Sequence, residues 1–286
     1  MASGATGGVA SEAASGLAGG GDAASAVARW RRRAVDYLPA TLFLVAVVLG
    51  WEAWVRVRDV PGYLLPPPSA LWQAFLDQRE VLPGHTRTTL TEAMLGLGLV
   101  AVLGVTLAAL IASVPLARRV LYPLLVLSQN IPVLVLAPLL AVWFGFGMTP
   151  KVLIVVLIGF FPIAVSTADG LIHADREMVE LVRSMGGNRA QVLRTVLIPS
   201  AVPSFFAGLQ IGAAYAVIGA VIAEWMGASS GLGLFITRSQ RAFRTDQIFM
   251  AVVLIALISI ALFVSVQLLA RLVMPWRQST TEPNGS

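Results

Sequence analysis

The chain contains no cysteine and only two histidines, and these absences exclude several kinds of chemistry. Without cysteine the chain cannot form a disulfide, use a thiol nucleophile or build a cysteine metal site. His85 and His173 are too far apart in sequence to suggest a metal site, and we expect each in a loop or at a helix end. No glycine-rich loop ending in Lys-Ser or Lys-Thr is present to bind the phosphates of ATP. The sequence therefore predicts no catalytic, metal-binding or cofactor-binding residues in this chain, and no enzyme.

Charged residues are also scarce, at 12% of the chain, whereas 57% of its residues are hydrophobic. This composition is far from that of a soluble domain. A helix satisfies its own backbone hydrogen bonds inside a membrane, and no alternating strand pattern competes with it here. We therefore predict an all-α membrane protein with six transmembrane helices, in six apolar runs of about the length that crosses a bilayer: Leu38–Val55, Thr89–Ser113, Val120–Phe144, Val152–Ala168, Ala201–Met226 and Ile248–Val273.

Basic residues indicate the orientation of these spans. Arg29 and Arg31–Arg33 immediately precede the first apolar run, which favours a cytoplasmic N-terminus. Six crossings then return the C-terminus to the cytoplasm. The other basic residues, including Arg87 and Lys151 in loops expected outside, are spread over both faces next to the spans. The formal net charge of +5 therefore indicates contact with anionic membrane lipid rather than with nucleic acid.

The two ends of the chain differ from the apolar region between them. Residues 1–28 are mainly Gly, Ala and Ser, which cannot bury enough surface to fold, so we expect a disordered cytoplasmic tail. Residues 29–274 form the predicted membrane domain, and residues 275–286 form a short cytoplasmic tail. The first apolar run is expected to be a retained span, because no small-x-small cleavage site follows Val55.

A charged segment, Glu180–Pro199, stands between two long apolar runs. An apolar helical face is predicted just before and within it, at the spacing i, i+3, i+4 and i+7: Met178, Leu181, Val182 and Met185. Gly186 and Gly187 can take positive φ and end this helix in a sharp turn. Asn188 can cap a second helix in a reciprocal arrangement with Gln191, and we expect Pro199 to end that helix and open the next span. The segment is predicted to be a hairpin of two short helices.

The spacing of this segment resembles the "EAA" loop of bacterial ABC importer permeases, with a glycine six residues after the glutamate and a proline thirteen residues further on. Leu181 and Val182 stand where that loop has alanines. In that family the loop is the coupling helix that fits a groove of the ATPase subunit, and the alternative is an ordinary cytoplasmic hairpin. The resemblance assigns ATPase coupling to Glu180, Leu181, Val182, Gly186, Leu193, Val196, Ile198 and Pro199.

The third apolar run is interrupted by Pro123, Pro132 and Pro138. Proline frees backbone carbonyls in a membrane helix, and polar side chains there need partners inside the protein. We therefore predict a broken helix that lines a translocation path, with Ser128, Gln129 and Asn130 facing the path. The alternative is a kinked helix that packs on its neighbours without touching solute.

The fifth run carries three further candidates for the path: Gln210, Tyr215 and Glu224. Gln210 and Glu224 are fourteen residues apart, close to four helical turns, so they share nearly one face. Glutamine in a membrane bundle often only joins helices, and Glu224 could simply reach the interface, so both alternatives stay open.

Between Tyr37 and Val273 the chain resembles permeases for nitrate, alkanesulfonates and taurine. A rigid segment, Pro61–Ser69, leads into an amphipathic stretch expected on the outer interface, as in that group. Shorter strings resemble the permeases for the thiamine-precursor pyrimidine and for riboflavin: Ser128–Pro132, Ala137–Leu139, Trp143–Gly147, Phe160–Pro162 and Asp169–Gly170.

These resemblances imply the type I ABC importer permease architecture in a bacterial inner membrane. The implied partners are an ATPase subunit that uses ATP, an external solute-binding protein, and a second copy or a related permease. The favoured solute is the pyrimidine or riboflavin, followed by nitrate, an alkanesulfonate or taurine.

Two other classes of protein are weighed against this one. An ion-coupled secondary transporter of a small solute usually needs ionisable groups near mid-membrane, and most of the apolar runs lack them. A membrane-anchored scaffold would have no use for a broken span or a coupling loop. Association with an ATPase and an external binding protein would support only the importer.

Overall fold

The computed structural model describes residues 38–275, so the predicted tail at 1–28 and residues 276–286 lie outside the described residues. The chain divides into two compact units, residues 1–69 and residues 70–286. In the first unit, the helix Leu38–Val57 carries Glu52, whose carboxylate accepts hydrogen bonds from the Ser69 amide (3.0 Å) and hydroxyl (2.8 Å). Arg56 pairs with the same carboxylate at 2.5 Å. These contacts tie Ser69, which follows the loop after this helix, back onto the helix.

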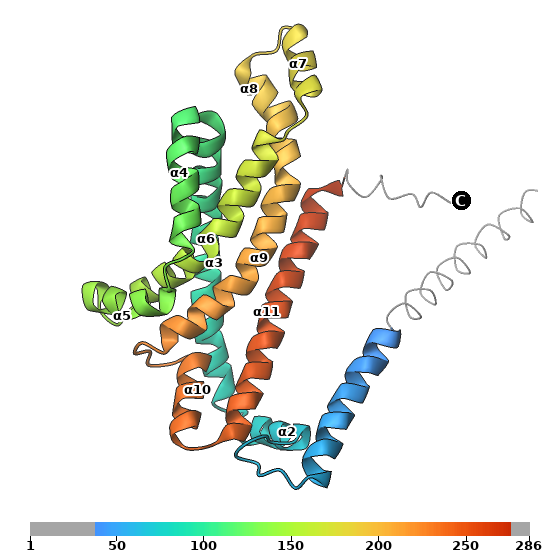
Figure 1. Cartoon of the computed structure of the whole chain (residues 1–286), viewed down its shortest axis with the longest axis vertical. Coiled ribbons are helices and arrows are strands. Elements are labelled where there is room, and N and C mark those ends of the chain that lie inside the picture. Colours follow the sequence, from blue (N-terminus) through green and yellow to red (C-terminus); the bar gives the residue numbers. More distant parts are fainter. Residues whose placement is uncertain (1–37, 276–286) are drawn as a thin grey trace, which may run out of the picture. The chain divides into compact units, whose positions relative to one another are not determined.

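Every regular element between residues 38 and 275 is a helix, which confirms the predicted all-α class. In Figure 1 the long helices of the second unit run side by side, with α7 and α8 at one end and α10 at the other. The elements are α2 (Pro68–Asp77), which begins at the boundary between the units, α3 (Leu82–Ser113), α4 (Pro115–Ser128), α5 (Val133–Phe144), α6 (Met148–Ile172), α7 (Arg176–Ser184), α8 (Arg189–Val192), the π-helix η1 (Leu193–Leu197), α9 (Ile198–Glu224), α10 (Leu232–Arg241) and α11 (Thr245–Val273).

The core of the second unit lies where α6 packs along α3 and α9. Glycines allow these helices to approach closely, as is usual between membrane helices. A Cβ added at Gly96 of α3 would lie 2.2 Å from Val155 of α6, and one added at Gly208 of α9 would lie 2.7 Å from the carbonyl oxygen of Pro162. The inner faces of the three helices are therefore fixed against one another.

Among residues 38–275, five helices are long and apolar enough to cross a membrane, and there are six spans if the bent pair α4 and α5 counts as one. The two helices of this pair meet at 98°, so the predicted break in the third run is confirmed. Pro132 stands at the break as the N-cap of α5, where its missing N–H removes no helical hydrogen bond. The predicted count of six is therefore reached when this broken pair is taken as the third span.

The predicted spans were too short at their starts. α3 begins at Leu82 and α6 at Met148, so Arg87 and Lys151 lie in helices and not in loops. Composition alone set the predicted boundaries at the polar residues. The helices continue through this polar region because several of its side chains, such as Lys151 and Glu92, are buried and paired with one another.

Pro199 does not end the second hairpin helix, which corrects the sequence-based prediction. The helix runs from Arg189 to Glu224 as one element of 36 residues, through the π-turn Leu193–Leu197. Pro199 lies in the first turn of α9, and the Ile198 amide reaches back to the Leu193 carbonyl across the wider turn. The π-turn thus lets the backbone pass a residue that has no N–H to donate.

Candidate functional site

The charged hairpin consists of α7, the Gly186–Gly187 turn and α8, and its first helix is fixed by a cap that the sequence analysis did not identify. Asp175 is the N-cap of α7, and its carboxylate accepts hydrogen bonds from the amides of Glu177 (2.9 Å) and Met178 (3.4 Å). Such a cap satisfies amides that have no partner in the first turn of a helix. The signal was visible in sequence as an aspartate one residue before the helix.

The turn of the hairpin needs two glycines for two different reasons. Gly186 has φ = +82°, and a Cβ there would meet nothing within 4 Å, so only its backbone conformation favours glycine. At Gly187 a Cβ would lie 2.6 Å from both the Val182 side chain and the Val182 carbonyl oxygen. Val182 therefore packs into the turn itself, and the sharp turn predicted at these glycines is confirmed.

The second helix of the hairpin starts with the predicted reciprocal cap. The Gln191 amide donates to the Asn188 side chain at 3.0 Å, and the Asn188 amide donates to the Gln191 side chain at 2.7 Å. This capping box holds the start of α8 with residues only three apart in sequence.

The apolar face of the hairpin is uncovered in the single chain. Leu181 is 52% exposed and Met185 is 79% exposed, and Met178 lies beside them on the same helical face. Of the other residues assigned to ATPase coupling, Glu180, Leu193 and Ile198 are exposed, Pro199 is half-buried and Val196 is buried. The hairpin stands at the end of the second unit, clear of the core helices (Figure 1). Its contacts to a partner stay a prediction.

The candidate path residues of the third span lie at its break. The Ser128 hydroxyl donates to the Leu125 carbonyl at 2.6 Å, and the Asn130 amide group donates to the Val126 carbonyl at 3.2 Å. Both groups therefore cap the end of α4, while Gln129 is exposed.

The candidates on α9 lie in different environments. Gln210 is half-buried, Tyr215 is exposed and Glu224 is fully buried. Between residues 38 and 275 no hydrogen bond joins the α4 candidates to these three residues, so the structure does not gather the six into one site. Their role in a path stays a prediction.

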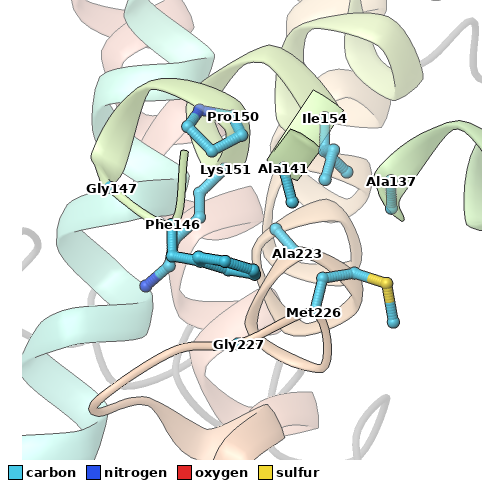
Figure 2. Close-up of a pocket in the computed structure, with 10 residues that line it drawn as sticks. All are labelled: Ala137, Ala141, Phe146, Gly147, Pro150, Lys151, Ile154, Ala223, Met226 and Gly227. Carbon is cyan, nitrogen blue, oxygen red and sulfur yellow. The ribbon is translucent and has the colours of Figure 1, made fainter. Parts of the chain in front are cut away.

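The predicted string Trp143–Gly147 forms the joint between α5 and α6. Gly145 ends α5 with φ = +77°, and the ring of Phe146 lies so close to Gly227 that a Cβ there would be 2.7 Å away (Figure 2). The cavity beside this ring, which Lys151 and Met226 help to line, has a volume of only about 10 Å³. It holds about one water molecule, so it is a packing gap and not a solute pocket.

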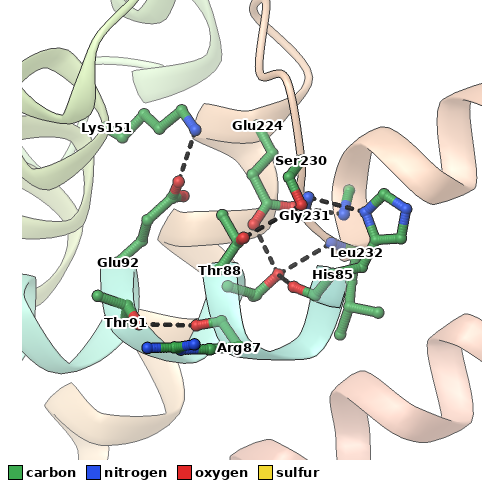
Figure 3. Close-up of polar contacts among 12 residues, drawn as sticks. His85, Arg87, Thr88, Thr91, Glu92, Lys151, Glu224, Ser230, Gly231 and Leu232 are labelled. Carbon is green, nitrogen blue, oxygen red and sulfur yellow. Dashed lines mark hydrogen bonds and ion pairs between the residues drawn. The ribbon is translucent and has the colours of Figure 1, made fainter. Parts of the chain in front are cut away.

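Glu224 belongs to a buried polar cluster that holds the start of α10 (Figure 3), and α10 lies at the end of the second unit opposite the hairpin (Figure 1). Its carboxylate accepts hydrogen bonds from the Thr89 hydroxyl (2.6 Å) and from the Gly233 amide in the first turn of α10 (2.5 Å). The cluster comprises the side chains of His85, Thr89, Glu92, Lys151 and Glu224 and the backbone of residues 231–233.

The same cluster fixes the start of α10 to α3. The Gly231 amide donates to Nδ1 of His85 at 2.9 Å, and the Leu232 amide donates to the Thr89 hydroxyl at 2.9 Å. Three successive amides that would otherwise lack partners at a helix start are thereby satisfied by side chains. Gly231 has φ = +133°, and a Cβ there would lie 2.1 Å from the Glu224 carboxyl carbon, so only glycine fits.

A buried ion pair joins α3 to α6 within the cluster. Nζ of Lys151 lies 2.5 Å from Oε1 of Glu92, whose side chain is fully buried. Of these side chains, only Glu224 was predicted from the sequence as a candidate functional residue. A signal was present, because His85, Thr89 and Glu92 follow the spacing i, i+4, i+7 and so share one helical face.

Known proteins similar to this chain are importer permeases. The chain is 38% identical to the formylaminopyrimidine transport permease protein ThiX of Halalkalibacterium halodurans, over 86% of this chain and 99% of that protein. It is also 38% identical to the riboflavin transport system permease protein RibX of Chloroflexus aurantiacus, over 85% of this chain and 90% of that protein. The chain is 29% identical to the taurine transport system permease protein TauC of Escherichia coli, over 87% of this chain and 93% of that protein.

A solved structure supports the fold. The crystal structure of an amino acid ABC transporter with histidines matches with a TM-score of 0.52 at 20% sequence identity, over 66% of this chain and 90% of that chain. Together with the all-helical structure and its five or six apolar spans, this likeness confirms the predicted type I ABC importer permease architecture. The family model for the inner membrane component of binding-protein-dependent transport systems matches residues 101–278, a range that holds both the charged hairpin and Glu224. The chain therefore belongs to the family of binding-protein-dependent transport system inner membrane components, and it is a permease subunit of an ABC importer.

Proposed function

We propose that this permease couples to a separate ATPase subunit through its charged hairpin. The main support is the shape of that hairpin, which is held by its own caps and turn yet leaves Leu181 and Met185 of its apolar face exposed. A helix with a large exposed apolar face at the end of a membrane domain fits a groove on a partner. The family resemblance of the same residues supports an ATPase as that partner. ATP would then bind the partner, and no cofactor would bind this chain.

The helix Arg189–Glu224 supplies a mechanical link for such coupling. At 1.5 Å per residue its 36 residues span about 54 Å, from the hairpin to the buried polar cluster. A displacement of the hairpin would therefore be carried through the membrane along one element. The π-turn at Leu193–Leu197 would be the point where the helix adjusts, because π-turns often mark functional sites in helices.

The complete importer would contain two permeases, identical or related, with two ATPase subunits and an external binding protein. One six-span unit is too small to enclose a regulated path by itself. Closure of the ATPase subunits would switch the path between inward-facing and outward-facing states. The hairpin and both termini would lie in the cytoplasm, as the arginines before the first span also indicate.

The solute we favour is a planar nitrogen heterocycle, either a formylated aminopyrimidine of the thiamine-precursor type or riboflavin. The support is the 38% identity to permeases named for those compounds, against 29% for the taurine permease. Taurine, alkanesulfonates and nitrate are the next candidates.

Reconstitution with the ATPase and the binding protein tests the function as a whole. We expect the solute-loaded binding protein to stimulate ATP hydrolysis, and uptake of the labelled pyrimidine or of riboflavin to require ATP. Uptake that proceeds without ATP and follows an ion gradient would instead support a secondary transporter.

Cysteine labelling tests the orientation, since the chain has no cysteine of its own. Asn188→Cys should resist an impermeant thiol reagent in intact cells and react after the membrane is opened. The matched position is the exposed Gln240 at the end of α10, and Gln240→Cys should react in intact cells. The reverse pattern would place the hairpin outside and contradict ATPase coupling.

A further inference from the structure

The buried polar cluster contains two carboxyl groups but a cation for only one of them. Glu92 and Glu224 are both fully buried. Nζ of Lys151 lies 2.5 Å from Oε1 of Glu92, whereas no basic side chain between residues 38 and 275 forms an ion pair with Glu224 (Figure 3). A carboxyl group that is buried without a cation is strongly disfavoured in its ionised form. A further positive charge therefore has to accompany Glu224.

His85 does not supply that charge. Its Nδ1 accepts a hydrogen bond from the Gly231 amide at 2.9 Å, so this nitrogen carries a lone pair. An imidazolium ring has hydrogens on both nitrogens and accepts no hydrogen bond, so the ring of His85 is neutral. The cluster therefore has one cation, Lys151, for two carboxyl groups.

The other elements around the cluster do not supply the charge either, within residues 38–275. α5 contains no titratable residue. On α10, Arg241 is exposed, and Arg238 is exposed with its charge acting on His85. At the start of α11, the guanidinium group of Arg244 pairs with Asp246 at 2.9 Å. The titratable side chains around Glu224 are therefore those of the cluster itself: His85, Glu92 and Lys151.

The hydroxyl group of Thr89 indicates where the charge is carried. It accepts a hydrogen bond from the Leu232 amide at 2.9 Å. It also lies within hydrogen-bonding distance of two oxygens, the His85 carbonyl at 3.2 Å and Oε1 of Glu224 at 2.6 Å. A hydroxyl group has a single hydrogen, so it does not donate fully to both oxygens. Both contacts become full hydrogen bonds when Glu224 has a hydrogen of its own and donates it to Thr89.

The carboxyl group of Glu224 is too tightly enclosed for a hydrated metal ion. A Cβ added at Gly231 would lie 2.1 Å from its carboxyl carbon, and one added at Gly233 would lie 3.0 Å from Oε2. The small cavity that Lys151 helps to line has a volume of about 10 Å³, enough for one water molecule, and Glu224 is not among its lining residues. A proton is the positive charge that fits this space.

We propose that the cluster binds one proton on the carboxyl group of Glu224, and that this proton makes the anchor of α10 sensitive to pH. The neutral acid donates to Thr89 through Oε1 and accepts from the Gly233 amide through Oε2, so both oxygens are satisfied without an unpaired buried charge. Loss of the proton places a second negative charge in the cluster with Glu92 and weakens the hold on the start of α10. This site goes beyond the import function, and its test needs only the purified permease.

Infrared spectroscopy detects the proton directly. A neutral carboxylic acid has a C=O stretching band that is separate from the bands of a carboxylate. In a detergent without ester groups at neutral pH, we expect this band in the wild-type permease and not in Glu224→Gln. The band should disappear from the wild type as the pH is raised.

Thermal unfolding compares the same substitution at the two carboxyl groups. Glutamine has the shape of a protonated glutamate and donates a hydrogen bond without taking up a proton. At neutral pH, Glu224→Gln should therefore melt no lower than the wild type, unlike other changes in the cluster. The matched variant is Glu92→Gln, which leaves Lys151 without its anion and should lower the melting temperature by about 6 °C or more.

The pH dependence has a definite sign. Folding of the wild type takes up a proton that the unfolded chain releases, so its stability falls as the pH rises. The wild type and Glu224→Gln should melt alike near about pH 5, close to the point where an unfolded glutamate binds its proton. Above that pH the wild type should melt progressively lower than Glu224→Gln.

Three results would overturn the proposal. Absence of the carboxylic acid band from the wild type at neutral pH would show that Glu224 is ionised, whatever the stability of the variants. A band that persists in Glu224→Gln would assign the proton to another group. A wild-type melting temperature that rises with sodium or potassium chloride, but not with the chloride of a bulky organic cation at equal ionic strength, would assign the missing charge to a metal ion.

Discussion

The charged hairpin and the buried polar cluster lie at opposite ends of the second unit and are built in opposite ways. In the hairpin, the capping contacts join residues two or three positions apart, and the apolar face is exposed. In the cluster, all contacts between helices except the one between Gly233 and Glu224 join residues 59 to 146 positions apart, and the carboxylates are fully buried. The caps and the turn of the hairpin therefore depend only on neighbouring residues, whereas the cluster exists only in the assembled fold. We therefore expect mutations in the hairpin to impair coupling at unchanged stability, and mutations in the cluster to lower stability first.

The largest effect on transport is expected for Gly186→Val. A β-branched residue at φ = +82° is strained by at least about 1–2 kcal/mol, so the turn should reopen and point α7 away from its partner. Uptake should be lost, and ATP hydrolysis should no longer respond to the binding protein, while thermal stability and membrane insertion stay normal.

The matched control is Gly186→Asn, which tolerates the same backbone conformation and should retain most of the uptake. Glu180→Lys changes one exposed charge of the proposed docking face and should reduce coupling less than Gly186→Val does. If Gly186→Val is expressed normally and takes up solute like the wild type, the coupling hypothesis is contradicted.

The largest effect on stability is expected for Lys151→Met. This change leaves the buried Glu92 carboxylate without its cation, and breaking one side of a buried pair costs about 3–5 kcal/mol. The melting temperature of the purified permease should fall sharply. The double variant Glu92→Gln/Lys151→Met removes both charges and should recover most of the loss. If the double variant is no more stable than Lys151→Met alone, the ion pair is not the cause.

A smaller effect is expected for Thr89→Val, which keeps the shape of the side chain and removes its hydroxyl. The Glu224 carboxylate and the Leu232 amide each lose a buried hydrogen bond, at a cost of about 1–3 kcal/mol. Thr91→Val is the control, because that hydroxyl is exposed and binds only the carbonyl of Arg87 in its own helix (Figure 3). Equal melting temperatures for the two variants would contradict the assigned role of the cluster.

The smallest effect is expected for the double change of Gln129 and Asn130 to Leu. Both side chains are exposed at the break of the third span, and Asn130 binds only the Val126 carbonyl near the end of α4. If these groups line the path, uptake of the heterocyclic solute should decrease while the stimulated ATPase rate is kept. Normal uptake of every candidate solute would show that they are surface residues of a broken helix.

Prediction from the sequence succeeded where neighbouring residues decide the structure. The break near Pro132, the turn at Gly186 and the reciprocal cap of Asn188 and Gln191 depend on residues a few positions apart, and the structure has all three. Prediction failed at Pro199, where a π-turn absorbs the missing amide. It also placed Lys151 in a loop, because the sequence does not reveal that Glu92 compensates its charge.

The sequence by itself determined the membrane class, the apolar helices and the caps and turn of the hairpin, because hydrophobic run length and local turn chemistry do not depend on distant residues. Only the tertiary structure decided what Glu224 does. A carboxylate at the end of an apolar run can line a path, reach the interface or cap another helix. Which of these roles it has depends on the groups that surround it in the fold. Here Thr89, far away in the chain, and the amide of Gly233 supply the hydrogen bonds that make its burial favourable, so the same residue anchors α10.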